Sequence, residues 1–268
     1  MEPVHSFCLL EEKNDSGHRL LYDKIGRYAA ENYAIIYAAE LDTTATVRKM
    51  RQYGIDVEDL IESGILTLID RDELYSVERT ELDGHALMNA WHAQMLKLKK
   101  HSNFAGILAL GSAENFLTQP QDHEKLVKYE QMIGTRFNIP FESVCCYSEK
   151  ALESISLSNL FAILNAHYST VHTSASRQWD PYEIIGISKK GIDSAFGGSE
   201  VADLFFNTLR LCYKLTEDHI VANPATLENL MVKVLGKESS DRCVASIKVE
   251  LRNRLSVGSS GKPRSLID

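Results

Sequence analysis

Residues 5–39, HSFCLLEEKNDSGHRLLYDKIGRYAAENYAIIYAA, hold two short apolar runs with a helical pattern between them. Both runs, at 5–10 and 33–39, are rich in residues that favour β-strands. Between them, apolar residues from Leu20 to Tyr28 recur at the spacing of one helix face. The stretch therefore predicts a strand–helix–strand unit with parallel strands.

The same alternation continues along the chain. Further apolar runs lie at 65–70, 104–110 and 143–148, and amphipathic helical patterns lie at 83–100 and 122–137. The run at 104–110 is almost continuously apolar, as expected of a central strand covered on both faces. This order predicts a three-layer α/β sandwich with a mostly parallel sheet, whose ligands would bind at the carboxyl ends of the strands.

The loop after the first run lies where many α/β proteins bind phosphate. It contains one glycine, Gly17, and no lysine follows it, so the GxxxxGK[ST] motif of a P-loop is missing. The acid that would hold Mg²⁺ after a buried strand is missing too, because Gly111 and Ser112 follow the fourth run and Glu114 lies two residues further on. The predicted architecture suits a nucleotide enzyme, but the groups that would hold phosphate and Mg²⁺ are missing from the sequence. We therefore expect no enzymatic activity.

The pattern changes near residue 180. Residues 174–190 are polar and include an Asp-Pro step, which predicts a linker or an edge strand, and every later pattern is helical. We therefore predict an α/β domain at 1–178, a small all-α domain at 179–255 and a disordered tail at 256–268.

Composition indicates an ordinary globular protein. The 268 residues are 44% hydrophobic and 25% charged, and no apolar run approaches the roughly 20 residues needed to cross a bilayer. The amino terminus lacks the pattern of a secretory signal, and the five cysteines are odd in number and scattered. We therefore expect a cytoplasmic protein without a disulfide framework.

The net charge of −8 does not suit a duplex-binding surface, which needs clustered cations. One local exception is the stretch from Arg242 to Arg264, where six basic residues accompany a single acid, Glu250. A solvated helix face followed by a tail is the simpler explanation, and a DNA-binding role has weak support.

Histidine and cysteine residues show no motif of a metal or catalytic site. The nine histidines form no HExxH motif, and clustered Cys/His spacing is missing. Cys145 and Cys146 point to opposite faces of a predicted strand, and His167 would meet them only if the fold brings them together. Structural roles are favoured over a metal site, and we expect no catalytic residue, cofactor or metal.

Aromatic and weakly polar residues near the predicted strand ends suit a small organic ligand. Tyr, Trp and His combine an apolar body with one polar tip, although each of them taken alone is more often an ordinary core residue. The candidates are His5, Tyr22, Tyr37, Trp91, Glu114, Glu130, Tyr147 and His167.

Several segments together resemble one known family. They are HSFCLLEE, GIDVEDLIESGILTLID, WHAQMLKLKKHSNFAGILALGSAENF, KLVKYEQMI, SVCCYS and LSNLFAILNAHYSTV, which follow one another over about residues 5–172. They are similar to the MEDS family, the methanogen/methylotroph sensory domain. The resemblance implies a RecA-like fold that has lost its phosphate loop and senses simple hydrocarbon derivatives, and one relative is a dichloromethane-responsive repressor.

The family's recurring positions carry over to six residues of this sequence. They are His5, Tyr129, Glu130, Cys145, Tyr147 and His167. The sequence differs from the family in two places: the common FYE after the first strand is CLLEE, and an acid after the fourth strand is Ser112. These differences leave the ligand unidentified.

Residues 192–255 resemble a helical module of the archaeal nitrosopumilus output domain class, through GIDSAFGGSEVADLFFNTL, TEDHIVANPATLENLMVKVLG and CVASIKVELRNRL. The pairing implies a sensor in which a small organic ligand bound at the strand ends changes how the helices pack or pair. The recipient would be a second copy or a partner signalling protein, with no membrane involved. The alternatives are a degenerate nucleotide-binding module without hydrolysis and a DNA-binding regulator of transcription.

Overall fold

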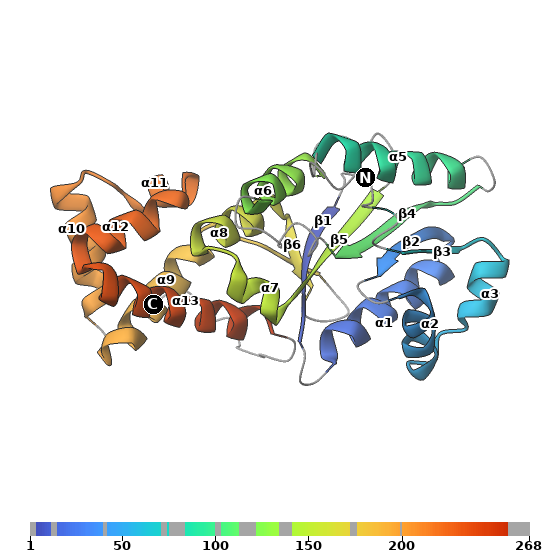
Figure 1. Cartoon of the computed structure of the whole chain (residues 1–268), viewed down its shortest axis with the longest axis horizontal. Coiled ribbons are helices and arrows are strands. Elements are labelled where there is room, and N and C mark those ends of the chain that lie inside the picture. The colour runs from blue at the N-terminus through green and yellow to red at the C-terminus, as the bar shows by residue number, and fades with distance from the viewer. Residues whose placement is uncertain are drawn as a thin grey trace, which may run out of the picture.

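The computed structural model shows an α/β part joined to a helical part (Figure 1). The residues that it describes are 4–11, 15–39, 42–70, 74, 84–99, 103–112, 122–133, 141–171, 176–198 and 200–256. The predicted disordered tail therefore lies, after Ser256, outside the described residues. No described helix combines the length and the apolar character that crossing a membrane requires.

One sheet of seven strands, counted over the described residues, forms the centre of the α/β part. Its order is β3-β2-β4-β5-β1-β6-β7, and all neighbours are parallel except the last pair, β6 and β7. The strands are β1 (Val4–Leu10), β2 (Tyr33–Ala39), β3 (Leu66–Asp70), β4 (Gly106–Ser112), β5 (Phe141–Ser148), β6 (Ser169–Val171) and β7 (Ser176–Gln178). The mostly parallel sheet predicted from the sequence is confirmed.

Helices cover both faces of this sheet (Figure 1). The helices are α1 (Ser16–Ala30), α2 (Thr43–Gln52), α3 (Val57–Glu62), α5 (Gly84–Lys99), α6 (Asp122–Ile133), α7 (Glu149–Ser154) and α8 (Leu157–Ala166). Because side chains alternate along a strand, Cys8 and Leu10 of β1 pack with α1, α2 and α3, while Phe7 and Leu9 pack with α5, α6 and α8. The three-layer arrangement is thereby confirmed.

The single glycine after β1 has a packing role. A Cβ atom on Gly17 would lie 2.4 Å from the carbonyl oxygen of Leu9, so only glycine lets α1 begin this close to the end of β1. Two carboxylates stand at the same end of α1: Asp15 is its N-cap residue, and Glu11 accepts a hydrogen bond from the hydroxyl of Ser16. The negative charges occupy the place where a phosphate would need positive partners.

The carboxyl-terminal part contains α9 (Glu183–Phe196), α10 (Val201–Cys212), α11 (Glu217–Ala222), α12 (Ala225–Leu235) and α13 (Lys237–Leu255). The edge strand predicted within 174–190 is present as β7, but the prediction of a linker was wrong from Glu183 onward. Gly186 and Gly191 weaken the helical pattern of α9 in the sequence. In the structure α13 crosses so close to Gly191 that its missing side chain is needed, because a Cβ atom would lie 2.5 Å from Ile247 Cγ1.

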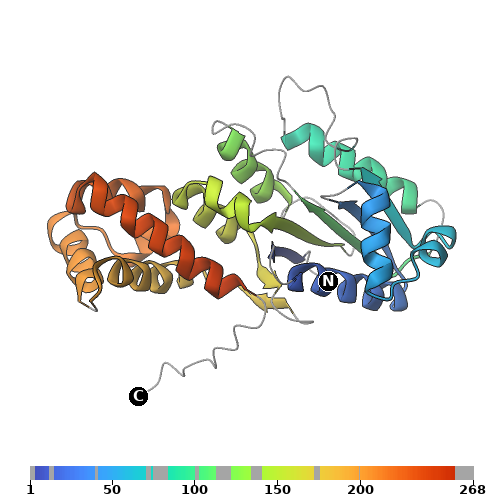
Figure 2. The ribbon, with the colours of Figure 1, turned by 60° about the horizontal axis from the view of Figure 1, so that its bottom comes forward.

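The helical part shares one apolar core with the α5, α6 and α8 side of the sheet. Helix α13 runs back from the other helices toward the sheet (Figure 2). Its Lys248 Nζ donates hydrogen bonds to the carbonyl oxygens of Glu153, at 2.7 Å, and Ile155, at 2.5 Å. In α12, the carboxylate of Glu228 accepts hydrogen bonds from both the backbone N–H and the hydroxyl of Ser158 at the start of α8.

Candidate functional site

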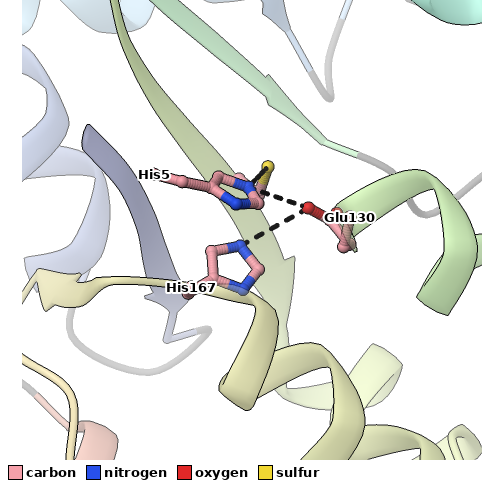
Figure 3. A group of neighbouring side chains, drawn as sticks. His5, Glu130 and His167 are labelled. Carbon is pink, nitrogen blue, oxygen red and sulfur yellow. Dashed lines mark hydrogen bonds and ion pairs between the residues drawn. The ribbon is translucent and has the colours of Figure 1, made fainter. Parts of the chain in front are cut away.

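Four side chains with strong ligand atoms meet inside the α/β part. His5 comes from β1, Glu130 from α6, Cys145 from β5 and His167 from the residue that ends α8. Figure 3 shows the carboxylate of Glu130 directed at the two imidazole rings. One ligand atom from each residue lies within 4.8 Å of all the others, and all four residues are buried. We call these four residues the His–Glu–Cys–His cluster.

The carboxylate of Glu130 is the centre of the cluster. Its Oε2 atom lies 3.0 Å from Nε2 of His5 and 3.5 Å from Nε2 of His167. The same Nε2 atom of His5 lies 3.2 Å from Sγ of Cys145, and the two imidazole rings have their centres 3.9 Å apart. The second carboxylate oxygen, Oε1, accepts a hydrogen bond from the hydroxyl of Tyr147.

Backbone carbonyls fix the orientation of both imidazoles. Nδ1 of His5 lies 3.1 Å from the carbonyl oxygen of Ala166, and Nδ1 of His167 lies 2.7 Å from that of Ile163. A carbonyl oxygen can only accept, so each Nδ1 carries a hydrogen, and in a neutral ring Nε2 then presents its lone pair to the cluster. The last turn of α8 and its end residue therefore hold the cluster together.

Burial and mutual contact shift the pKa values of these groups. Burial alone would raise the pKa of Glu130, but the two imidazoles and the Tyr147 hydroxyl outweigh it and lower the pKa to about 2. Burial, with a contribution from His5, lowers the pKa of His167 to about 3. Burial and the charge of Glu130 raise the pKa of the Cys145 thiol and of the Tyr147 hydroxyl. Near neutral pH the cluster therefore contains a buried carboxylate beside a neutral His167.

A small pocket adjoins the cluster and shares Cys145 with it. It lies between α5 and α6 on one side and β4 and β5 on the other, and its free space is about 20 Å³ for the centre of a water-sized molecule. Most of its wall is apolar, with Met88, Met95, Ala109, Ile133 and Phe141 among the lining residues. The pocket therefore suits a compact, largely apolar molecule.

Polar groups in the pocket wall come from both layers. Trp91 and Tyr129 line it from α5 and α6, and the Trp91 Nε1–H donates to the Tyr129 hydroxyl at 2.9 Å. Ser143 of β5 also lines it, and its buried hydroxyl makes no hydrogen bond within the described part of the chain. A bound molecule with one polar group would find a partner in the Ser143 hydroxyl.

The structure brings together most of the residues proposed from the sequence. The cluster with Tyr147 and the pocket residues Trp91 and Tyr129 all lie on one side of the sheet; they are His5, Trp91, Tyr129, Glu130, Cys145, Tyr147 and His167. Tyr22 and Tyr37 belong to the separate core on the opposite face, so their assignment to the same pocket was wrong. Glu114 lies outside the described residues.

Only part of the set lies near the carboxyl ends of the strands, where the sequence analysis placed it: Tyr147 is the second-to-last residue of β5. His5 is the second residue of β1, and the pocket lies on the face of the sheet beneath α5 and α6. The helices that cover this face supply Glu130 and His167, which is why the residues meet there and not at the sheet edge. Ser143 was missed, because a single serine in an apolar strand has no sequence pattern that marks it.

A protein-family model described as the methanogen/methylotroph, DcmR sensory domain, or MEDS, matches residues 5–167. The match covers more than half of the chain. The chain belongs to the MEDS family. It therefore contains a domain of a sensory family, and this supports a role in signal transduction. His5 and His167 stand at the two ends of the MEDS match, so the whole cluster lies within it. Comparison with curated proteins found no match.

Proposed function

We propose that the protein is a non-enzymatic sensor that binds a small organic molecule in the pocket beside the His–Glu–Cys–His cluster and relays binding to the carboxyl-terminal helices. The observation that carries this proposal is an apolar pocket with one unsatisfied hydroxyl, that of Ser143 among the described residues, next to the buried polar cluster. The pocket's size favours a molecule of a few heavy atoms. Simple alcohols, amines and halocarbons have this size and polarity.

Helix α8 is the element that would carry the relay. Its end is held to the cluster through the carbonyl oxygens of Ile163 and Ala166. Its start is held to α12 by Glu228, and Asn165 donates to the carbonyl oxygen of Val221 in α11 at 3.3 Å. A helix of ten residues spans about 15 Å and moves as one unit, so a ligand that repositions its end also changes these contacts.

A ligand changes the helices only if it binds one arrangement better than another. The recipient in this proposal is a second copy of the chain or a partner protein. Glu228→Gln is the variant that tests the relay, because it weakens the contact between α8 and α12 without touching the pocket. Hydrogen exchange of α12 and α13 should change on ligand binding in the parent chain, and this change should be reduced in Glu228→Gln.

Binding itself is best followed through Trp91. The chain has two tryptophans, so a Trp179→Phe background leaves Trp91, in the pocket wall, as the sole indole fluorophore. Methanol, methylamine and dichloromethane are titrated against this chain, with a thermal melt in parallel. A compound at about 100 times its dissociation constant stabilises the fold by about 2.7 kcal/mol, which raises the melting temperature by a few degrees.

Control variants distinguish an effect on the pocket from a general effect on the fold. Ser143→Ala should weaken binding of a compound that has a polar group, and Ala109→Leu should block the pocket. Ser6→Ala is the matched control, because Ser6 lies on the neighbouring strand and hydrogen-bonds Ser169 away from the pocket. Equal loss of binding in Ser6→Ala, or no saturable response to any compound in a folded chain, would contradict the proposal.

The two alternative functions have less support. Nucleotide binding is disfavoured because two carboxylates, those of Glu11 and Asp15, stand at the start of α1, where they would repel a phosphate. For DNA binding, the cations of α13 already have partners: Lys248 bonds carbonyl oxygens, Arg252 faces Glu149 and Glu153, and Arg254 pairs with Glu183. Weak binding of Mg·ATP, and DNA affinity that is absent or insensitive to salt, are the expected results.

A further inference from the structure

The His–Glu–Cys–His cluster has the composition of a transition-metal site. Two imidazole nitrogens, one thiol sulfur and one carboxylate oxygen lie within 4.8 Å of one another. Zinc is bound in proteins by these same atom types, usually four at a time in a tetrahedron. Bond lengths of 2.0–2.3 Å place the ligand atoms of such a tetrahedron about 3.3–3.8 Å apart. The three separations of 3.0, 3.2 and 3.5 Å in the cluster lie close to this range.

The hydrogen-bonding pattern leaves lone pairs facing one another. Each Nδ1–H donates to a backbone carbonyl, so in neutral rings Nε2 of His5 and of His167 both present lone pairs to Oε2 of Glu130. Oε2 of Glu130 and Nε2 of His167 are both buried, and among the described residues their polar contacts are limited to each other and, for Oε2, to Nε2 of His5. Converging acceptors of this kind require a cation between them, either a proton or a metal ion.

The surroundings of the ligand atoms match those of metal sites. Metal-binding histidines usually donate the other ring N–H to a carbonyl or carboxylate, which is the arrangement of both imidazoles here. The Tyr147 hydroxyl donates to Oε1 of Glu130 and thereby orients Oε2 toward the histidines. Each ligand residue is thus held in position by a group outside the cluster or by its strand.

Charge gives a further reason for a divalent ion. A buried carboxylate needs a compensating positive charge. If Cys145 loses its thiol proton to solvent on binding, its thiolate and the Glu130 carboxylate carry two negative charges, which balance M²⁺ while both imidazoles stay neutral. The loaded site is then electrically neutral inside the protein.

We propose that His5, Glu130, Cys145 and His167 bind one divalent transition-metal ion, with Zn²⁺ as the expected occupant. A mixed N₂SO set of four ligand atoms favours Zn²⁺ over Mg²⁺ or Ca²⁺, which prefer oxygen ligands in larger numbers. The metal site does not depend on the sensor function, since it requires no organic ligand. It joins β1, β5, α6 and the end of α8, so the ion also fixes the helix that contacts the carboxyl-terminal part.

The test is a titration of the untagged 268-residue chain, stripped with EDTA, with Co²⁺ and then Zn²⁺. The titrated chain carries the Cys212→Ser substitution, because Cys212 is exposed and its thiol would bind metal by itself. We expect one Co²⁺ per chain, with the thiolate-to-cobalt charge-transfer band and visible bands of a tetrahedral ion, and displacement by one equivalent of Zn²⁺. No organic compound is present, so failure of the ligand proposal leaves this result unaffected.

Variants identify the ligands. Cys145→Ser should abolish the charge-transfer band, while Cys146→Ser, the adjacent residue on the other face of β5, should keep it. Tyr147→Phe should lower the affinity by about 10- to 100-fold, because removing a hydrogen-bond partner of a metal ligand typically has an effect of that size. His167→Gln, which removes a ligand itself, should lower it by more than roughly 100-fold.

Circular dichroism and a thermal melt establish that each variant is folded. Because the spectrum of the parent chain reports the thiolate by itself, the proposal stays testable where a variant fails to fold. A folded parent chain that binds no ion, a parent spectrum without the thiolate band, or a band that persists in Cys145→Ser and disappears in Cys146→Ser would overturn the proposal.

Discussion

Gly191 of α9 lies against Ile247 of α13 so closely that a Cβ atom at position 191 would be 2.5 Å from Ile247 Cγ1 and 2.6 Å from its Cα. The second of these atoms belongs to the backbone, which cannot move aside as a side chain can. The two helices therefore cross where one of them has no side chain. This relationship makes the position of α13, which also reaches the α/β part through Lys248, dependent on one glycine.

Gly191→Ala should destabilise the protein by about 1–3 kcal/mol, because overpacking of a close helix contact forces the helices apart. Gly186→Ala is the matched control in the same helix, since a Cβ atom there meets nothing within 4 Å. That change should stabilise the protein by up to about 1 kcal/mol through helix propensity. Urea unfolding measures both, and equal effects of the two substitutions would contradict the packing explanation.

Tyr147→Phe should destabilise the metal-free chain by about 1–3 kcal/mol. The substitution removes the donor to Oε1 of Glu130 and leaves part of a buried carboxylate without its partner. Tyr168→Phe is the control, because Tyr168 is 56% exposed. Unfolding in guanidinium with EDTA present compares the two variants, and a Tyr147→Phe chain as stable as the control would show that the hydroxyl is not needed.

The layered sheet was predictable from sequence because it depends on a repeated pattern. Each strand and helix of the α/β part has its own apolar period, and alternation along β1 explains why Phe7 and Cys8 face different layers. The first half of α9, up to residue 190, was interpreted as a linker or an edge strand although it lies within the predicted all-α domain. The close approach that requires glycine at position 191 comes from Ile247, 56 residues away in the sequence.

The sequence predicted which residues form the site but not how they are arranged in space. His5 and His167 are separated by most of the α/β part in the sequence, so no spacing rule for metal sites detects that they meet. Residue type also failed to tell the two faces apart. Tyr37 has the same character as Tyr147, yet it points into the opposite core, because residue type does not say toward which layer a tyrosine on a given strand points.

Asp15→Asn should lower stability at pH 7, and this effect should shrink as the pH falls below the ordinary carboxyl pKa of 3.8. Burial opposes ionisation of Asp15, but the Lys49 ammonium and the Tyr53 hydroxyl outweigh it, so the pKa of Asp15 is lowered from 3.8. A carboxyl whose pKa is lower in the folded state stabilises the fold above its unfolded pKa, and this contribution disappears as pH falls through the folded pKa. Asn tolerates the left-handed backbone of Asp15, whose φ is 54°.

The size of this effect is limited by solvent. The Asp15 side chain is 42% exposed, so we expect less than about 1 kcal/mol, decreasing further at high salt. Asp23→Asn, at an exposed position of α1, serves as the control. Thermal unfolding measured from pH 2.5 to pH 7 compares both variants with the parent chain, and a loss in Asp15→Asn that is the same at both ends of the range would contradict the assignment.

Lys248→Met should loosen the carboxyl-terminal helices from the α/β part. Methionine keeps most of the side-chain length but removes the two hydrogen bonds from Nζ to the carbonyl oxygens of Glu153 and Ile155, at a cost of about 1–3 kcal/mol. Those carbonyls close α7, directly before α8, so hydrogen exchange should increase at α7 and at the start of α8. Lys233→Met, on the exposed side of α12, should leave both stability and exchange unchanged. A uniform increase in exchange throughout the sheet would instead indicate general destabilisation and would contradict a local role for Lys248.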